Sequence, residues 1–164
     1  MENNPNSKVP VAPVLFAIIV LFFFGNFFTI SCGGQKVAGV SGFNLVTGTK
    51  IEASKNSRRG SGEKIPANIW AIIGFGAAIA GGAISYFSKH EKRDKQAAIV
   101  AAVGLVSHVI LIFSVSNSVN KKGGGAITAE VQLSYLIVLI LFAVVAWLCY
   151  KKSKQALEPP AVTD

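Results

Sequence analysis

Charged side chains are scarce in this sequence. Only 15% of its 164 residues are Asp, Glu, Lys or Arg, whereas 51% are hydrophobic. The mean hydropathy is +0.50, and a soluble domain of this length carries about a quarter charged residues. The shortage of charge therefore excludes an ordinary soluble domain and predicts a membrane protein.

Acidic residues are the rarer of the charged kinds. The chain has 8 Asp and Glu against 16 Lys and Arg, which gives a formal net charge of +8. In a membrane protein, excess cations usually lie in loops beside anionic lipid headgroups. The basic balance therefore predicts a lipid bilayer as the partner of the basic loops, and no nucleic acid.

Cysteines and catalytic motifs are also sparse. Cys32 and Cys149 are expected at opposite faces of the bilayer, so no disulfide joins them. Cys32 stands in a loose lipobox-like context, so lipidation after a cleaved signal sequence is an alternative. The sequence holds no P-loop, CxxC, HExxH or nucleophile-elbow motif. These absences predict a non-enzymatic protein with no catalytic residues, no metal site and no cofactor.

Four long apolar segments are what the sequence does contain. Each is long enough to cross a hydrocarbon core of about 30 Å as a helix. The expected fold is an all-α membrane protein, with four transmembrane helices in an antiparallel bundle and a small β-hairpin or sheet cap formed by the first and third loops. In chain order, we expect an N-terminal tail at 1–8, transmembrane helix 1 at 9–31, an extracytoplasmic loop with a hairpin at 32–67, transmembrane helix 2 at 68–87, a cytoplasmic loop at 88–96, transmembrane helix 3 at 97–119, an extracytoplasmic loop at 120–133, transmembrane helix 4 at 134–150 and a C-terminal tail at 151–164.

Glycines and short polar residues punctuate the start of the first loop. This pattern predicts a hairpin at the membrane surface that turns at Ser41 and Gly42, with a flexible Gly-rich linker as the alternative. A strand in the third loop alternates well enough to extend the hairpin into a small sheet. The residues of this loop motif are Cys32, Gly33, Gly34, Gln35, Ser41, Gly42 and Gly48.

Two runs in this loop carry a resemblance. The run Cys-Gly-Gly-Gln-Lys-Val begins at Cys32, and Ser-Gly-Phe-Asn-Leu-Val-Thr-Gly begins at Ser41. Together they resemble a motif of uncharacterised bacterial four-helix membrane proteins of similar length. The resemblance is specific over about residues 28–48 and is one of hydropathy elsewhere. It implies a shared topology and a bacterial origin, and it implies no activity.

Small residues lie four apart in the second apolar segment. Such spacing lets a neighbouring helix backbone approach closely, so this helix is expected at the centre of the bundle. A channel or ligand groove lined by glycine is the alternative interpretation. The helix-packing residues are Gly74, Ala77, Ala78, Gly81 and Gly82.

His108 is an ionisable residue expected at bilayer depth, where such a group is a functional-site candidate. It shares a helix face with Ala101 and other small residues. The favoured role is a hydrogen bond to another helix. The alternatives are a proton relay and single-ligand binding of a haem or chlorophyll-type pigment, because no second intramembrane histidine exists. The candidate hydrogen-bond partners are Ser107, Ser85 and Asn26.

Lys and Arg divide equally between the two expected faces, so their density beside the helix ends decides the orientation. The dense clusters in loop 88–96 and after residue 150 predict both termini in the cytoplasm. With the bacterial origin that the resemblance implies, the expected membrane is a bacterial inner membrane. The expected function is an accessory or assembly subunit of a larger membrane complex, in contact with other subunits or as a homo-oligomer. The alternatives are a cofactor-binding subunit using His108 and a small transporter or channel.

Overall fold

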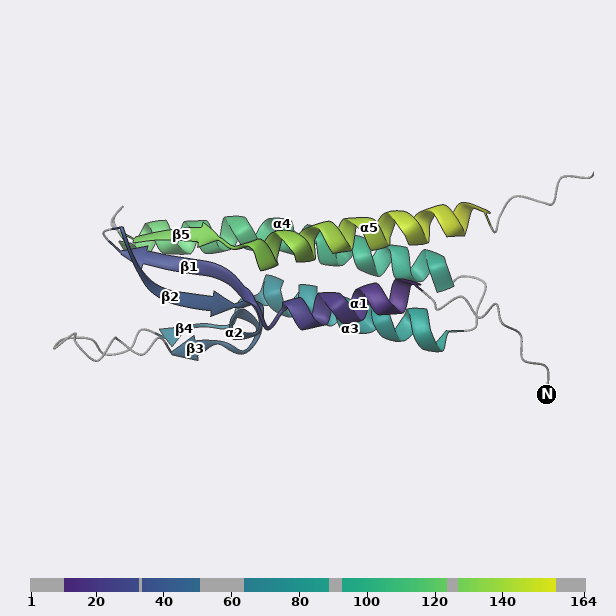
Figure 1. The fold of residues 1–164 in the computed structure, drawn as a ribbon, viewed down its shortest axis with the longest axis horizontal. Coiled ribbons are helices and arrows are strands. Elements are labelled where there is room, and N and C mark those ends of the chain that lie inside the picture. The colour runs from purple at the N-terminus through teal and green to yellow at the C-terminus, as the bar shows by residue number, and fades with distance from the viewer. Residues whose placement is uncertain (1–10, 33, 51–63, 89–92, 124–126, 156–164) are drawn as a thin grey trace, which may run out of the picture.

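Three long apolar helices and a small antiparallel sheet dominate the fold, a computed structural model drawn in Figure 1. By length and composition these helices can cross a membrane, which indicates that the chain associates with a membrane. They are α3 (Ile69–Phe87), α4 (Arg93–Gly123) and α5 (Leu133–Gln155). The structure describes residues 11–32, 34–50, 64–88, 93–123 and 127–155.

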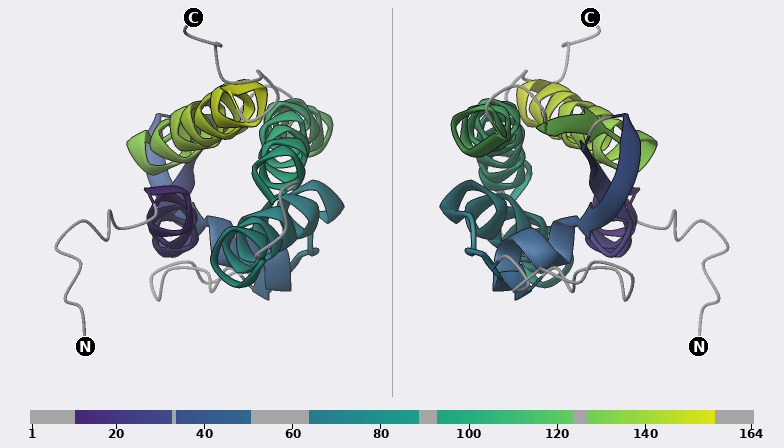
Figure 2. Two further views of the ribbon diagram at one scale, coloured as in Figure 1. Left: turned by 90° about the vertical axis from the view of Figure 1, so that its right-hand side faces the viewer. Right: turned by 90° about the vertical axis from the view of Figure 1, so that its left-hand side faces the viewer.

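A further apolar helix, α1 (Val11–Phe22), is shorter than the sequence predicts. Its 12 residues extend about 18 Å, against about 30 Å for a hydrocarbon core. The second half of the predicted helix at 9–31 is instead the strand β1 (Asn26–Cys32). That part of the prediction is wrong, and the bundle of four spanning helices is not confirmed. α1 packs against α3 and α5, which both contact α4 (Figure 2).

The break after α1 is held by backbone hydrogen bonds from the first loop. The N–H of Gly42 donates to the carbonyl of Gly25 at 3.3 Å, and the N–H of Phe43 donates to the carbonyl of Phe23 at 2.7 Å. A Cβ added at Gly25 would lie 2.7 Å from the Ser134 hydroxyl, so the chain also passes close to α5. Because lipid supplies no hydrogen bonds, the backbone groups freed where a helix breaks inside a membrane need hydrogen-bond partners from elsewhere in the protein. Tertiary contacts therefore end a helix that composition alone predicts to continue.

The antiparallel sheet has the strand order β2-β1-β5. Strands β2 (Gln35–Ser41) and β5 (Ile127–Val131) come from the first and third loops, as the sequence predicts, but the central strand comes from the predicted first span. The sheet therefore exists but begins earlier in the chain than expected. A separate pair, β3 (Thr49–Lys50) and β4 (Lys64–Ile65), follows in the first loop.

The hairpin turns between Cys32 and Gln35, which pair across it. Gly34 lies in this turn with a φ of +80°, a conformation that glycine adopts without steric cost. The predicted turn at Ser41 and Gly42 is wrong, because Ser41 caps the short helix α2 (Gly42–Thr47). Its hydroxyl accepts a hydrogen bond of 3.1 Å from a backbone N–H in the first turn of α2.

The elements separate into a sheet end and a helical end (Figure 1). The 31 residues of α4 extend about 46 Å, so part of this helix projects beyond a hydrocarbon core of about 30 Å. At the sheet end α4 packs along β5. The start of α1, the end of α3, the start of α4 and the end of α5 lie together at the helical end.

Asn68 links the start of α3 to α4 by a side-chain hydrogen bond near the sheet end. Its side-chain oxygen caps α3 by accepting from the N–H of Trp70 at 3.0 Å, and its Nδ2 donates to the Ser114 hydroxyl at 3.1 Å. We expect Asn68→Ala to lower the free energy of unfolding by about 1–2 kcal/mol, because the cap and the interhelical bond are both lost. Helix content followed by circular dichroism during SDS titration measures this loss. The control is Ser118→Ala, which removes an exposed hydroxyl bonded within α4; an equal loss in the control would contradict the prediction.

Candidate functional site

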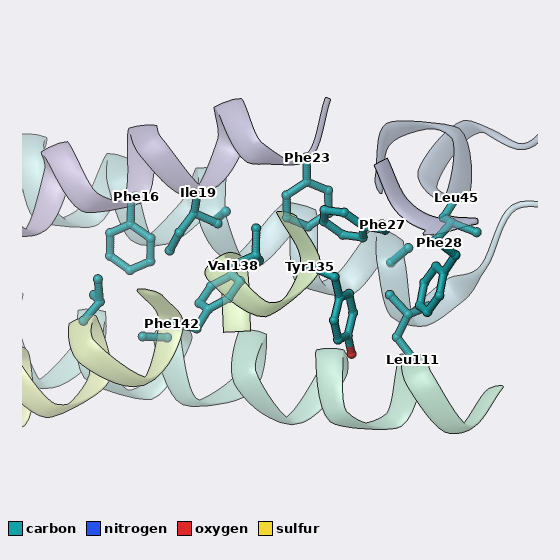
Figure 3. Close-up of a cluster of buried hydrophobic side chains, with 14 of the residues drawn as sticks. Phe16, Ile19, Phe23, Phe27, Phe28, Leu45, Leu111, Tyr135, Val138 and Phe142 are labelled. Atoms are coloured by element: carbon teal, nitrogen blue, oxygen red, sulfur yellow. The ribbon is translucent and has the colours of Figure 1, made fainter. Parts of the chain in front are cut away.

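His108 lies in the buried core, on the inner face of α4. Its side chain is 0% exposed, and Ala101 and Leu111 on the same helix are also fully buried. Figure 3 shows core side chains from α1, β1, α4 and α5 directed into the space between these elements. The imidazole is therefore closed off from both lipid and water.

Four aromatic rings surround the imidazole. The ring centroids of Phe142, Phe23, Tyr135 and Phe27 lie 5.2, 5.4, 5.9 and 6.1 Å from that of His108. The Phe23 ring meets the imidazole at an interplanar angle of 90°, an edge-to-face arrangement that aromatic electrostatics favour. Phe23 follows α1, Phe27 belongs to β1, and the other two rings come from α5. The enclosure is thus assembled from segments far apart in the chain.

Gly74 brings α3 against the same imidazole. A Cβ added at Gly74 would lie 2.5 Å from Cε1 and 2.8 Å from Nδ1 of His108. Contacts this short do not occur between well-packed atoms, so a larger residue would require the ring or the helix to move. Glycine at this position therefore sets the distance between α3 and α4.

The imidazole makes a hydrogen bond within its own helix. Its Nδ1 lies 2.9 Å from the carbonyl oxygen of Gly104. Because a carbonyl only accepts, Nδ1 carries the hydrogen, and Nε2 of the neutral ring is an acceptor. Within the described part of the chain, Nε2 has no hydrogen-bond partner. His108 therefore keeps one buried nitrogen that the surrounding fold does not use.

The predicted cross-helix partners of His108 are wrong. Ser107 donates to the carbonyl of Val103 at 2.8 Å, Ser85 has no partner among the described residues, and Asn26 lies exposed at the start of β1. The interhelical hydrogen bond comes instead from the hydroxyl of Tyr135, which donates to the backbone carbonyl of His108. The imidazole itself contributes packing, and its backbone supplies the link to α5.

The sequence does not reveal Tyr135 and Phe142 as neighbours of the histidine. An aromatic residue near the end of an apolar segment usually marks the membrane interface, yet Tyr135 is 1% exposed. The available signal is spacing, because buried residues recur on α5 every three or four positions. Residues on the lipid side are equally apolar, so hydropathy does not single out this face. The buried residues of α5 are Tyr135, Val138, Phe142, Val145 and Cys149.

The small residues of α3 face its helical neighbours, α1 and α4. A Cβ added at Gly81 would clash with the ring of Phe16 on α1, as one at Gly74 would clash with His108 on α4. Glycine and alanine thus permit close approach on both sides of α3. The buried members of the predicted packing set are Gly74, Ala77, Ala78 and Gly81, and Gly82 is half-buried.

The residues of the loop motif have backbone roles at the sheet end. Gly48 ends α2 with a φ of +76°, and a Cβ added at Gly42 would lie 2.6 Å from the ring of Phe27. Gly33 lies outside the described residues. The motif therefore shapes the hairpin and the start of α2. The remaining members are Cys32 and Gln35 beside the turn, Gly34 within it and Ser41 at the cap.

Across the residues that the structure describes, no three His, Cys, Asp or Glu side chains are grouped so as to hold a metal ion. The described cysteine side chain, Cys149, is a buried free thiol. No protein-family model matches the chain, and no curated protein matches it either. The geometry around His108 and the surface of the protein are therefore the features that bear on its function.

Proposed function

We propose that this chain is a non-enzymatic integral membrane protein that acts through its contacts, as an accessory or assembly subunit of a larger membrane complex. The membrane is the bacterial inner membrane, with the helical end and both termini on the cytoplasmic side. The observation that carries the proposal is the enclosure of His108. Gly74 and four aromatic rings occupy the space that a substrate would need beside the imidazole. A core filled in this way stabilises the fold and has no room for a substrate, so the protein acts through its surface.

The outer faces of the long helices support a role through contacts. Large apolar side chains are exposed along all three of them, which suits lipid or the helices of another subunit. Exposed apolar faces of this size are compatible with a stable protein only where lipid or another subunit covers them and excludes water. Examples with more than half of the side chain exposed are Ile79 on α3, Val106 and Phe113 on α4, and Ile140 and Trp147 on α5.

A small transporter or channel is less well supported, because the buried polar groups are not aligned. Ser107 is bonded to its own helix, and Ser114 is bonded to Asn68. Ser85 lies about 16 Å along α3 from Gly74, at about 1.5 Å per residue. A continuous polar path along the core needs groups at closer intervals than these.

A cofactor-binding subunit is the second candidate, because Nε2 of His108 has no partner among the described residues. A haem or chlorophyll-type pigment held by one histidine would be bound at this nitrogen. The surrounding rings leave such a macrocycle no room unless α1, β1 and α5 move apart. The packing therefore favours the colourless accessory subunit over the pigment-binding one.

Gentle detergent extraction from native membranes separates the two candidates. On a native gel we expect the chain to migrate with other membrane proteins, identified by mass spectrometry, and the band to have no visible absorbance. His108→Leu should insert and keep these partners, because leucine preserves an apolar core. The control is Val109→Leu, a change at the neighbouring residue, whose side chain is 42% exposed. A visible absorption band that His108→Leu removes would replace the proposal with pigment binding, and migration without any other protein would contradict it.

A further inference from the structure

A groove lies between α4 and α5 close to the helical end. It encloses about 480 Å³ and is lined in part by Ala98 and Ala102 of α4 and by Ala146 of α5. The small side chains leave the space open, and the rings of Trp147 and Tyr150 border it. This groove is separate from the enclosure of His108, because its residues face outward and those two rings are 60% and 56% exposed.

The groove changes from polar to apolar along the helices. Lys95 and Ser153 line it near the start of α4 and the end of α5. Ala102 and Ala146 lie about 10 Å further from these ends, at about 1.5 Å per residue. A ligand that fits it therefore has a polar group at the helical end and an apolar chain that runs toward the middle of the protein.

Two further lysines are held beside the groove by its aromatic residues. Lys151 Nζ lies 5.4 Å from the ring centroid of Trp147, and Lys154 Nζ lies 5.3 Å from that of Tyr150. Such cation–π contacts restrain the ammonium groups close to the rings. Together with Lys95 they place three cations around the polar part of the groove.

Among the residues that the structure describes, the acidic residue beside Lys95 in the chain is Asp94, and it does not cancel this charge. The carboxylate of Asp94 lies 3.4 Å from Nε of Arg93, so its charge is already paired. The positive end of the α4 dipole in this turn is offset by the negative end of α5 beside it, so the lysines supply the net positive charge here. The polar part of the groove is therefore complementary to an anion.

We propose that the groove binds one anionic phospholipid of the bilayer. Its phosphate group lies beside Lys95, Lys151 and Lys154, and one acyl chain follows the alanines of α4 and α5. A zwitterionic lipid offers the same chain, but its headgroup carries a cation that the three lysines disfavour. Free phosphate matches the lysines and leaves the alanine-lined part empty. This inference does not depend on the proposed function as a subunit.

Trp147 provides a direct reporter of the groove. The chain has 2 Trp residues, so Trp70→Phe leaves the fluorescence of Trp147 alone. The full-length variant is reconstituted into vesicles that contain brominated phosphatidylglycerol or brominated phosphatidylcholine, whose bromines quench nearby tryptophan. We expect the anionic lipid to quench Trp147 with a preference of roughly fivefold or more, the size expected from one lysine near a headgroup. Equal quenching by the two lipids would overturn the proposal.

Matched variants assign the preference to the groove. In the same background, Lys95→Gln should lower the preference for the anionic lipid by roughly fivefold, whereas Lys36→Gln, an exposed change at the sheet end, should leave it unchanged. Ala102→Leu should reduce quenching by both lipids because it fills the groove. Ala80→Leu, an exposed change on α3, is its control. Equal effects of a variant and its control, or displacement of the lipid by inorganic phosphate, would overturn the proposal.

Discussion

Replacing Gly74 with alanine should lower the free energy of unfolding by about 1–3 kcal/mol, the usual cost of overpacking a core. The added methyl group would lie 2.5 Å from Cε1 of His108. The imidazole has little freedom to withdraw, because the Phe142 and Phe23 rings lie 5.2 and 5.4 Å from it, centroid to centroid. Circular dichroism during SDS titration of the full-length protein measures the change.

Two further variants make this expectation specific. Gly76→Ala is the matched control, because nothing lies within 4 Å of a Cβ added there. It should leave stability unchanged or raise it by up to about 1 kcal/mol through helix propensity. In a His108→Ala background, Gly74→Ala should cost little, because the three atoms nearest to the added Cβ all belong to the imidazole. The same loss with and without His108 would show that another contact limits α3.

Replacing Phe142 with alanine should cost about 2–4 kcal/mol and is the second large effect. The side chain is 0% exposed, and a Cβ added at Gly104 would clash with its ring. The cost arises from lost packing and from the cavity left beside His108. It falls below the largest values for soluble proteins, because in the unfolded state lipid still surrounds the phenylalanine. The SDS titration used for Gly74 measures it.

Phe113→Ala is the control for this cavity. Phe113 lies on α4 and is 65% exposed, so its loss should change stability by less than about 0.5 kcal/mol. Phe142→Leu, which keeps more of the buried volume, should cost about 1 kcal/mol. Comparable losses for Phe142→Ala and Phe113→Ala would mean that the ring of Phe142 does not support the core.

The sequence predicts best the elements whose limits depend on local composition. The predicted span at 68–87 coincides closely with α3, because Asn68 caps the helix and a long apolar run follows. The strand predicted in the third loop is present as β5, where alternating side chains favour extended backbone. In both cases neighbouring residues carry the information.

The end of α1 shows where local composition is insufficient. Residues 9–31 are apolar and contain several phenylalanines, which suit a helix in lipid and also a strand. Whether these residues form helix or strand depends on two sets of partners. The N–H groups of Gly42 and Phe43 donate to backbone carbonyl groups just after the end of α1. In addition, β1 pairs with β2 and β5. These partners come from other parts of the chain, so the apolar run does not contain the information that ends the helix.

His108 illustrates the same division within the candidate site. Its spacing from Ala101 predicts a shared helix face, and both side chains are 0% exposed. The spacing does not identify Tyr135 or Phe142 as neighbours. In a soluble protein, polar residues on the outer face would indicate which side of α5 is buried. Here lipid makes both faces apolar, and that signal is lost.

By itself the sequence determined that the chain has helices long and apolar enough to cross a membrane, where α3 begins and ends, and which α4 residue is the buried ionisable group. Only the tertiary structure decided that α1 ends at Phe22, that β1 is the central strand, and that Gly74 and four aromatic rings enclose His108. The physical reason is that hydropathy is a property of neighbouring residues. Strand pairing, backbone hydrogen bonding and close packing are instead decided between segments that meet only when the chain folds.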